Sequence, residues 1–224
     1  MTLPAMVLAA GLGTRMRPLT DDRPKALVRV AGRALVDHAL DQVEGCAPVV
    51  VNAHHHADAL ARHLADRDVA VSREDVLLDT AGGLRAALPL LGGDAVLTIN
   101  ADMVWTGPRA RDTLVAAWDP DRMDALMLLT RIKRRVEPGR WAFARGRDGT
   151  LSRAADGWDY AGAGIVKTAG LAALPVGPAS LRALWEPMLA AGRLHGVSHP
   201  GGWMDVGRPE AIPRAEAMLA GIPA

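Results

Sequence analysis

Continuously apolar runs recur along the first 130 residues and are separated by segments with helical spacing. Strands that are apolar on both faces are typical of a parallel sheet covered by helices and joined by right-handed crossovers. The sequence therefore predicts an α/β, Rossmann-like fold with a mostly parallel mixed sheet flanked by helices. The expected strands are 5–9, 48–52, 69–72, 95–99 and 125–130, and the expected helices are 34–44, 57–65 and 82–91.

The pattern changes after residue 130. A turn at 147–149 predicts a hairpin, a further strand is expected at 160–167, and helices are expected at 179–191 and 209–219. The sequence shows no repeat, low-complexity segment or clear linker. We therefore expect one domain over residues 1–224, in which the second half adds a layer to the first.

Composition limits the setting of the protein. With 26 basic and 25 acidic residues the net charge is +1, which predicts neither a nucleic-acid nor a membrane partner. Cys46 is the only cysteine, so an internal disulfide is excluded and a reducing compartment is favoured. No apolar run approaches the ~18 residues of a membrane-spanning helix, and no signal peptide is recognisable. We expect a cytoplasmic protein.

A glycine-rich loop directly follows the first expected strand. It contains Gly11 and Gly13 and then supplies Arg15 and Lys25. Glycines let phosphate oxygens approach successive backbone N–H groups. The planar guanidinium of Arg15 can bind a phosphate through two nitrogens, and the ammonium of Lys25 adds a localised positive charge. In a doubly wound sheet the loop lies at the carboxyl ends of the strands, where ligands bind. The loop therefore predicts phosphate binding, with a purely structural turn as the alternative.

Two common phosphate-binding motifs are absent from this loop. The pattern GxxxxGK[ST] does not occur, and GxGxxG fails because its sixth position is Met16. The sequence therefore argues against a P-loop enzyme and against a dinucleotide-dependent enzyme.

The complete string from Gly11 to Lys25, G-x-G-T-R-x-x-P-L-T-x-x-x-P-K, resembles the signature of the sugar-1-phosphate nucleotidyltransferases. The resemblance covers almost the whole chain. It implies a nucleotide-diphospho-sugar transferase fold, with a nucleotide-binding side at about 1–130 and a sugar-binding side at about 131–224. It also implies that Arg15 and Lys25 are catalytic, and that the nucleoside triphosphate is bound by Ala10, Gly11, Gly13, Thr14 and Arg15.

The resemblance also implies a metal site. In this family one aspartate at the end of a central strand and one in a late Asp-x-Gly element hold Mg²⁺, and Asp102 and Asp205 stand at the matching positions. Mg²⁺ typically takes one or two carboxylates together with phosphate oxygens and waters. Each aspartate alone would be read as a helix cap or a solvated turn.

Further contacts follow from the same resemblance. Asp79, Gly82 and Gly83 match the family's nucleobase contact, although an ordinary helix start capped by Asp79 or Thr80 is the alternative. The expected sugar-binding residues are Asn52, His54, Tyr160 and Gly162. Glycine within a strand suggests the close approach of a ligand or of another backbone. The basic run 131–135 is interpreted as a solvated loop.

The compact chain is most similar to the bacterial branch that makes nucleotide sugars from N-acetylmuramic acid α-1-phosphate and UTP in cell-wall recycling. We expect no C-terminal β-helix domain. The Glu-Lys-Pro motif of other branches is absent, which leaves open which cation holds the sugar phosphate; Lys25 is the first choice, with Arg15 turned toward the nucleoside triphosphate. Mannose-1-phosphate guanylyltransferase and glucose-1-phosphate uridylyl- or thymidylyltransferase remain as alternatives, and the oligomeric state stays open.

A different class of function is a regulatory subunit that binds nucleotide sugars without turnover. Such a protein is expected to lose its loop cations or its metal-binding aspartates. All four of these charged residues are present: Arg15, Lys25, Asp102 and Asp205. The sequence therefore favours an enzyme.

Overall fold

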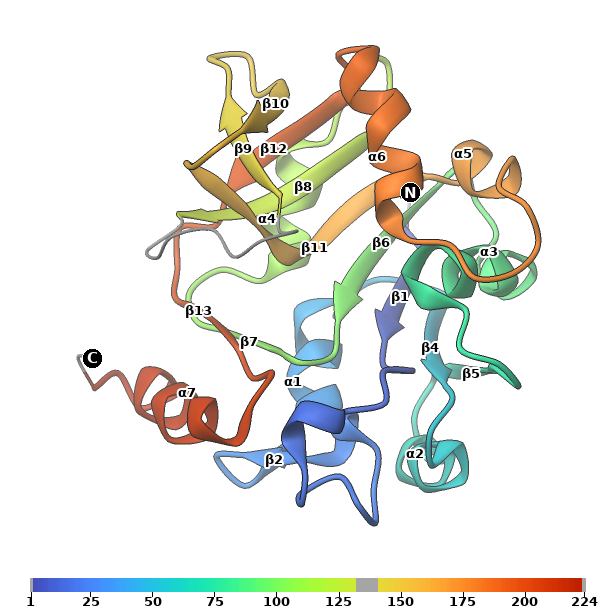
Figure 1. The fold of residues 1–224 in the computed structure, drawn as a ribbon, viewed down its shortest axis with the longest axis vertical. Helices are drawn as coiled ribbons and strands as arrows, with labels where there is room; N and C mark the ends of the chain where they lie inside the picture. The colour runs from blue at the N-terminus through green and yellow to red at the C-terminus, as the bar shows by residue number, and fades with distance from the viewer. Residues whose placement is uncertain (1, 132–140, 223–224) are drawn as a thin grey trace.

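The computed structural model describes residues 2–131 and 141–222. Its central sheet has a parallel part in the order β6-β1-β4-β5 (Figure 1). These strands are β1 (Ala5–Leu8), β4 (Val49–Ala53), β5 (Ala70–Arg73) and β6 (Ala95–Asn100). The burial of β1, β4 and β6 matches the continuously apolar runs, whereas the edge strand β5 is only partly buried. The predicted α/β fold with a mixed sheet is confirmed.

Antiparallel strands extend the sheet beyond β6. The long strand β11 (Trp158–Lys167) pairs with β6 on one side and with β8 (Ala125–Arg131) on the other. The expected hairpin forms from β9 (Ala142–Arg145) and β10 (Leu151–Ala154), and β12 (Leu194–Ser198) pairs parallel with β8. The basic run 131–135 lies outside the described residues apart from Arg131.

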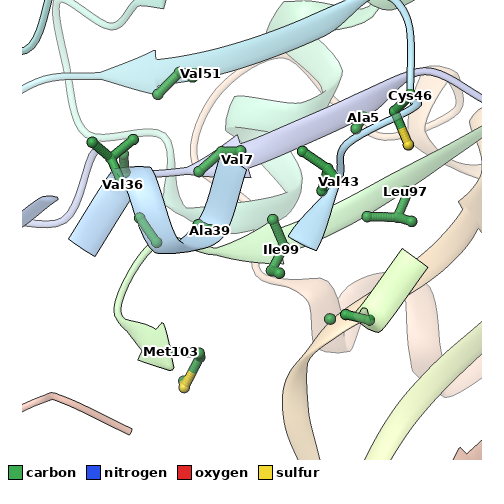
Figure 2. Packing of buried hydrophobic residues seen from close by; sticks show 14 of the residues in the cluster. Ala5, Val7, Val36, Ala39, Val43, Cys46, Val51, Leu97, Ile99 and Met103 are labelled. Atoms are coloured by element: carbon green, nitrogen blue, oxygen red, sulfur yellow. The ribbon is translucent and has the colours of Figure 1, made fainter. Parts of the chain in front are cut away.

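Alternate residues of the central strands pack against helices on opposite faces of the sheet. On one face, Val36 and Ala39 of α1 lie over Val7 and Ile99 (Figure 2), and α4 joins the same cluster. On the other face, Met6 belongs to a second cluster of buried residues that includes side chains of α3, α5 and α6. The helices are α1 (Leu35–Gln42), α2 (Ala57–Leu64), α3 (Asp79–Leu91), α4 (Ala110–Ala117), α5 (Thr168–Ala172), α6 (Leu181–Ala190) and α7 (Ile212–Leu219).

A third, smaller cluster of buried residues ties together segments that are distant in sequence. Met16 from the glycine-rich loop packs with Val104 of β7 (Met103–Trp105) and with Val206, which directly follows β13 (Trp203–Asp205). Strands β7 and β13 pair antiparallel as a separate small sheet (Figure 1). This cluster therefore fixes the loop beside the two late strands.

Several elements were not predicted from the sequence. These are α4, α5, β7, β12, β13 and the short hairpin of β2 (Arg29–Val30) and β3 (Arg33–Ala34). Helix α3 also begins at Asp79 rather than at residue 82. In the part of the chain that the structure describes, no helix has the length and apolarity needed to cross a membrane.

Candidate active site

The glycine-rich loop leaves β1 and is folded back on itself by a compact contact. Gly13 has φ 65°, and its carbonyl accepts a 2.9 Å hydrogen bond from the buried Thr20 hydroxyl. A Cβ on Gly13 would lie 3.0 Å from side-chain atoms of both Thr20 and Lys25. Gly11, in contrast, is exposed, and no heavy atom lies within 4 Å of the place a Cβ would occupy. The loop thus presents open backbone at Gly11 and is anchored beyond it.

Lys25 and Asp102 meet across the base of this loop. The Lys25 Nζ donates a 2.6 Å hydrogen bond to Oδ2 of Asp102, and the two side chains are 12% and 27% exposed. Asp102 lies in the short turn between β6 and β7, directly before Met103, and Lys25 begins the short 3₁₀ turn Lys25–Leu27. An ion pair this sheltered from water is screened much less than an exposed one.

Asp205 is brought to the same place by strand pairing. Residue Asp205 faces Met103 in the β13–β7 ladder, and the Val206 N–H donates 2.9 Å to the Asp102 carbonyl oxygen. A Cβ on Gly207 would lie 2.8 Å from Asp205 Oδ1 and 3.3 Å from an Arg15 Nη2 nitrogen. Arg15, Lys25, Asp102 and Asp205 therefore gather at one site from four segments of the chain.

The donor set of this site fits magnesium. Asp102 and Asp205 supply hard carboxylate oxygens, which are the ligands that Mg²⁺ prefers. Within the described residues no group of three or more His, Cys, Asp or Glu side chains forms a metal cluster. Two carboxylates leave the remaining positions to water and to substrate phosphate, as is usual for Mg²⁺ in phosphoryl-transfer enzymes.

In the segment predicted to contact the nucleobase, Gly82 and Gly83 are packed closely against other parts of the protein. The N–H groups of Ala81 and Gly82 donate to the Ala179 carbonyl at 2.8 and 3.0 Å. A Cβ on Gly82 would clash with the Gly177 carbonyl, and one on Gly83 would lie 2.6 Å from Glu74 Oε1. Both glycines are buried, so segment 177–179 and Glu74 occupy the space where bare backbone was expected to meet a base.

Asp79 is the exposed residue at this end of α3. It has φ 57°, which is uncommon for a residue with a side chain, and its Oδ1 accepts a 2.6 Å hydrogen bond from the Thr80 N–H. Asp79 is the first residue of α3 rather than its N-cap, so this bond to the next residue is not the helix cap that was the alternative to the nucleobase contact. The contacts of Asp79, Gly82 and Gly83 with a base stay predictions.

The four predicted sugar residues are not brought together. Asn52 and the segment containing His54 belong to the end of β4, whereas Tyr160 and Gly162 lie on β11, and β1 and β6 run between these two strands. The amide of Asn52 is 3% exposed and bonds within the protein. The Nδ1–H of His54 donates 2.8 Å to the Glu74 carbonyl.

Tyr160 and Gly162 differ in where they face. The ring of Tyr160 lies edge-on to Trp185 at 5.0 Å, its hydroxyl bonds to that of Thr98, and burial raises the pKa of Tyr160 to about 12. Gly162 (φ 83°) lies in an irregular stretch of β11, where a Cβ would be 2.8 Å from Met103 Cγ. Of the four, Gly162 is thus the one that lies against β7, beside Asp102.

The structure adds residues that the sequence did not single out. Glu74 is buried between β4 and α3, and Trp203 donates 2.7 Å from its indole nitrogen to the Ala161 carbonyl. The Trp203 bond ties β13 to β11 and so fixes the approach of Asp205. Gly207 had a signal, since it ends the Asp-x-Gly element, but the burial of Glu74 depends on contacts that a sequence alone does not reveal.

Two open hollows lie beside the outer part of the loop and are not lined by the predicted site residues. The smaller, of about 360 Å³, is lined by charged residues that include Arg23, Arg33 and Asp37, and the larger, of about 610 Å³, runs from Pro18 to Ile212. Arg23 pairs with Asp22, and Arg33 pairs with Asp41. Two of the arginines that line these hollows are therefore already engaged in ion pairs within the protein.

The chain is similar to known proteins over nearly its full length. Residues 5–197 match the model of the MobA-like NTP transferase domain. The chain is 43% identical to N-acetylmuramate alpha-1-phosphate uridylyltransferase of Caulobacter vibrioides, over 96% of both chains. It is 31% identical to the protein of the same name from Neisseria meningitidis serogroup B, over 96% of this chain and 97% of that one.

A solved structure shows the same fold. A Bacillus anthracis protein described as a glucose-1-phosphate thymidylyltransferase superposes with a TM-score of 0.83, covering 100% of this chain and 97% of that one at 18% identity. The fold and the full-length similarity therefore agree. The chain belongs to the MobA-like NTP transferase family and, within it, to the sugar-1-phosphate nucleotidyltransferases.

Proposed function

We propose that the protein condenses UTP with N-acetylmuramic acid α-1-phosphate to give a nucleotide sugar and pyrophosphate. The observation that carries the proposal is the convergence of Arg15, Lys25, Asp102 and Asp205 beside an open glycine loop. The choice of UTP and of the muramate phosphate is supported by the names of the two relatives that match nearly the full chain.

The reaction requires positioning and charge neutralisation rather than a catalytic base. An oxygen of the sugar phosphate attacks the α-phosphorus of UTP, a new P–O bond forms, and the bond to the leaving pyrophosphate breaks. A phosphate monoester dianion is already nucleophilic, so the protein has to align the reactants and stabilise charge. Backbone N–H groups of residues 11–14 hold the triphosphate, Arg15 neutralises charge on the leaving group, and Lys25 draws in the sugar phosphate.

Asp102 and Asp205 are the residues that would hold Mg²⁺. When bound, such an ion neutralises phosphate charge and orients the attacking and leaving oxygens. The Lys25 Nζ donates a hydrogen bond to Asp102, so the same carboxylate also keeps the Lys25 ammonium beside the loop. Arg15 and Asp205 both border Gly207, which places the guanidinium next to the second carboxylate.

The cellular setting belongs to the same proposal. N-acetylmuramic acid is a cell-wall sugar, so a reaction that activates its 1-phosphate serves the recycling of cell-wall fragments. UTP is a cytoplasmic substrate, and the single cysteine of the chain suits a reducing compartment. We place the reaction in the cytoplasm.

Pyrophosphate release tests the proposal. Purified protein with Mg²⁺ is offered UTP, dTTP, GTP, CTP and ATP against the 1-phosphates of N-acetylmuramic acid, N-acetylglucosamine, glucose and mannose. Release with UTP and the muramate phosphate is the expected result. Release with mannose 1-phosphate and GTP, or with glucose 1-phosphate, would replace the substrate pair and keep the mechanism. Silence from a folded protein that binds nucleotide would favour a regulatory subunit.

A further inference from the structure

A buried polar bridge crosses the space between β4 and α3. The side chains of Asn52 and Glu74 belong to residues that are 3% and 7% exposed, and the Asn52 Nδ2 donates a 2.7 Å hydrogen bond to Glu74 Oε1. Burying a carboxylate and an amide is costly unless their hydrogen-bonding groups are satisfied. The partners of the outer atoms therefore show what the bridge is for.

Each end of the bridge holds a backbone N–H of a different segment. Asn52 Oδ1 accepts a 2.6 Å bond from Ala9, the first residue after β1 on the way into the glycine-rich loop. Glu74 Oε2 accepts a 3.1 Å bond from Leu78, the residue directly before α3. The β1–β4 ladder has its last paired residues at Val7 and Val51. The bond from the Ala9 N–H to the Asn52 side chain therefore continues the connection between the two segments beyond the end of strand pairing.

The start of α3 is shaped around the bridge. A Cβ on Gly83 would lie 2.6 Å from Glu74 Oε1 and 3.0 Å from Asn52 Nδ2. The backbone of Glu74 is itself held by β4, since its N–H donates 2.8 Å to the Ala53 carbonyl. The bridge therefore sets the separation between the loop that begins at Ala9 and the turn at residues 78–83.

We propose that Asn52 and Glu74 are positioning residues that hold the triphosphate loop and the base-side turn at the spacing of one nucleoside triphosphate. The inference rests on the proposed function, which places the triphosphate at the N–H groups of residues 11–14, and on the predicted nucleobase contact at residues 79–83. It assigns Asn52 to the nucleotide half of the site instead of to the sugar. Because both side chains are buried, the bridge acts through the Ala9 and Leu78 N–H groups.

A swap of the two functional groups tests the bridge. Asn52→Asp alone sets two carboxylates against each other, and Glu74→Gln alone sets an amide N–H against one of its two present donors. The double variant Asn52→Asp/Glu74→Gln restores every bond: the aspartate accepts from Ala9 and from the glutamine amide, whose oxygen accepts from Leu78. Asp75→Asn, an exposed change in the same turn, is the matched control.

The readout compares the affinity for UTP with the affinities for its two halves, uridine and tripolyphosphate. A merely structural role would not change UTP binding alone. Titration calorimetry gives the Kd of UTP, of uridine and of inorganic tripolyphosphate for each variant, and thermal unfolding checks the fold. We expect each single variant to bind UTP roughly 10²-fold more weakly, the scale for a misplacement of about 1 Å. Each half alone should bind within about twofold of wild type, because each half-site is intact. The double variant should recover UTP binding, and Asp75→Asn should equal wild type.

The contrary results are equally defined. Folded single variants that bind UTP normally, or a double variant no better than the singles, would overturn the proposal. So would equal weakening of UTP and of both halves. If the single variants do not fold, Glu74→Asp, which keeps both acceptor oxygens and draws the turn inward, must show the same loss for UTP alone. If wild type does not bind UTP, the proposed function fails, and the series is repeated with the triphosphate that it does bind.

Discussion

Two glycines of the same loop meet different demands. Gly13 needs its left-handed φ of 65°, and a Cβ there would press on Thr20 and Lys25. Gly11 is under neither constraint, because no positive φ is recorded for it and no protein atom lies near its open side. Because the fold does not require glycine at position 11, the bare backbone there is interpreted as space for a bound ligand.

Alanine at these two positions is expected to separate folding from binding. Gly13→Ala should lower the free energy of unfolding by about 1–3 kcal/mol, because it combines strain at positive φ with a crowded contact. Gly11→Ala should leave stability within about 0.5 kcal/mol, as for a substitution without contacts, and should raise KM for the nucleoside triphosphate. Urea unfolding and steady-state kinetics measure the two effects. Normal KM in Gly11→Ala would remove the open backbone from phosphate binding.

Lys25 has a second expected effect through Asp102. Lys25→Met removes the ammonium that lies 2.6 Å from the carboxylate, so turnover should fall roughly 10²–10³-fold, the scale for one lost charge partner in the transition state. The free protein should bind Mg²⁺ more tightly, because Asp102 is no longer neutralised. Kinetics and calorimetric titration with Mg²⁺ measure both changes. Lys167→Met, which breaks a similar pair with Asp124 at 3.0 Å, is the control and should change neither.

At the scale of elements, the start of α3 depends on a segment that lies far along the chain. Segment 177–179 supplies the Ala179 carbonyl that accepts the Ala81 and Gly82 N–H groups, two of the donors that a helix leaves unsatisfied at its start. The chain between α5 and α6 thus acts as the cap that α3 does not have in its own side chains.

Gly82→Ala is expected to release this cap. The added methyl group would collide with the Gly177 carbonyl and push segment 177–179 away, so the free energy of unfolding should fall by about 1–3 kcal/mol. Chemical denaturation measures the loss. Ala86→Ser, on an exposed position of the same helix, is the control. Stability unchanged in Gly82→Ala would mean that the segment does not hold the helix.

The elements that sequence analysis found are those whose signal is local. The central strands are continuously apolar, and α1 and α2 have helical spacing, so their positions were predicted within a few residues. The three-residue strands β7 and β13 were not predicted, because they exist only by pairing with each other across the chain. For the same reason the family resemblance indicated Asp102 and Asp205 separately, whereas their meeting and the burial of Glu74 required the structure.

At the scale of the whole molecule, the single tyrosine reports on the folded state. Tyr160 is the only tyrosine in the chain, and burial raises its pKa to about 12 from the usual 10. The folded protein therefore keeps this proton at a pH where the unfolded chain has lost it. Stability from this group is complete below pH 10 and declines as the pH rises toward 12.

Alkaline titration should show this directly. The phenolate absorbance is expected to rise near pH 12 in the folded protein and near pH 10 in denaturant. Tyr160→Phe should abolish the signal and remove this part of the alkaline loss of stability. Phenolate absorbance that appears near pH 10 in folded protein would show that the hydroxyl reaches water freely.

The late return of the chain to β7 has a consequence for how the protein is made. The glycine loop, Lys25 and Asp102 leave the ribosome early, whereas Asp205 and Gly207 follow after nearly all of the sheet has been translated. A nascent chain that stops before β13 therefore lacks the second carboxylate beside Arg15. Under the proposed mechanism the site is complete only once β13 has been made, so a truncated chain released from the ribosome before that strand is expected to be inert rather than partly active.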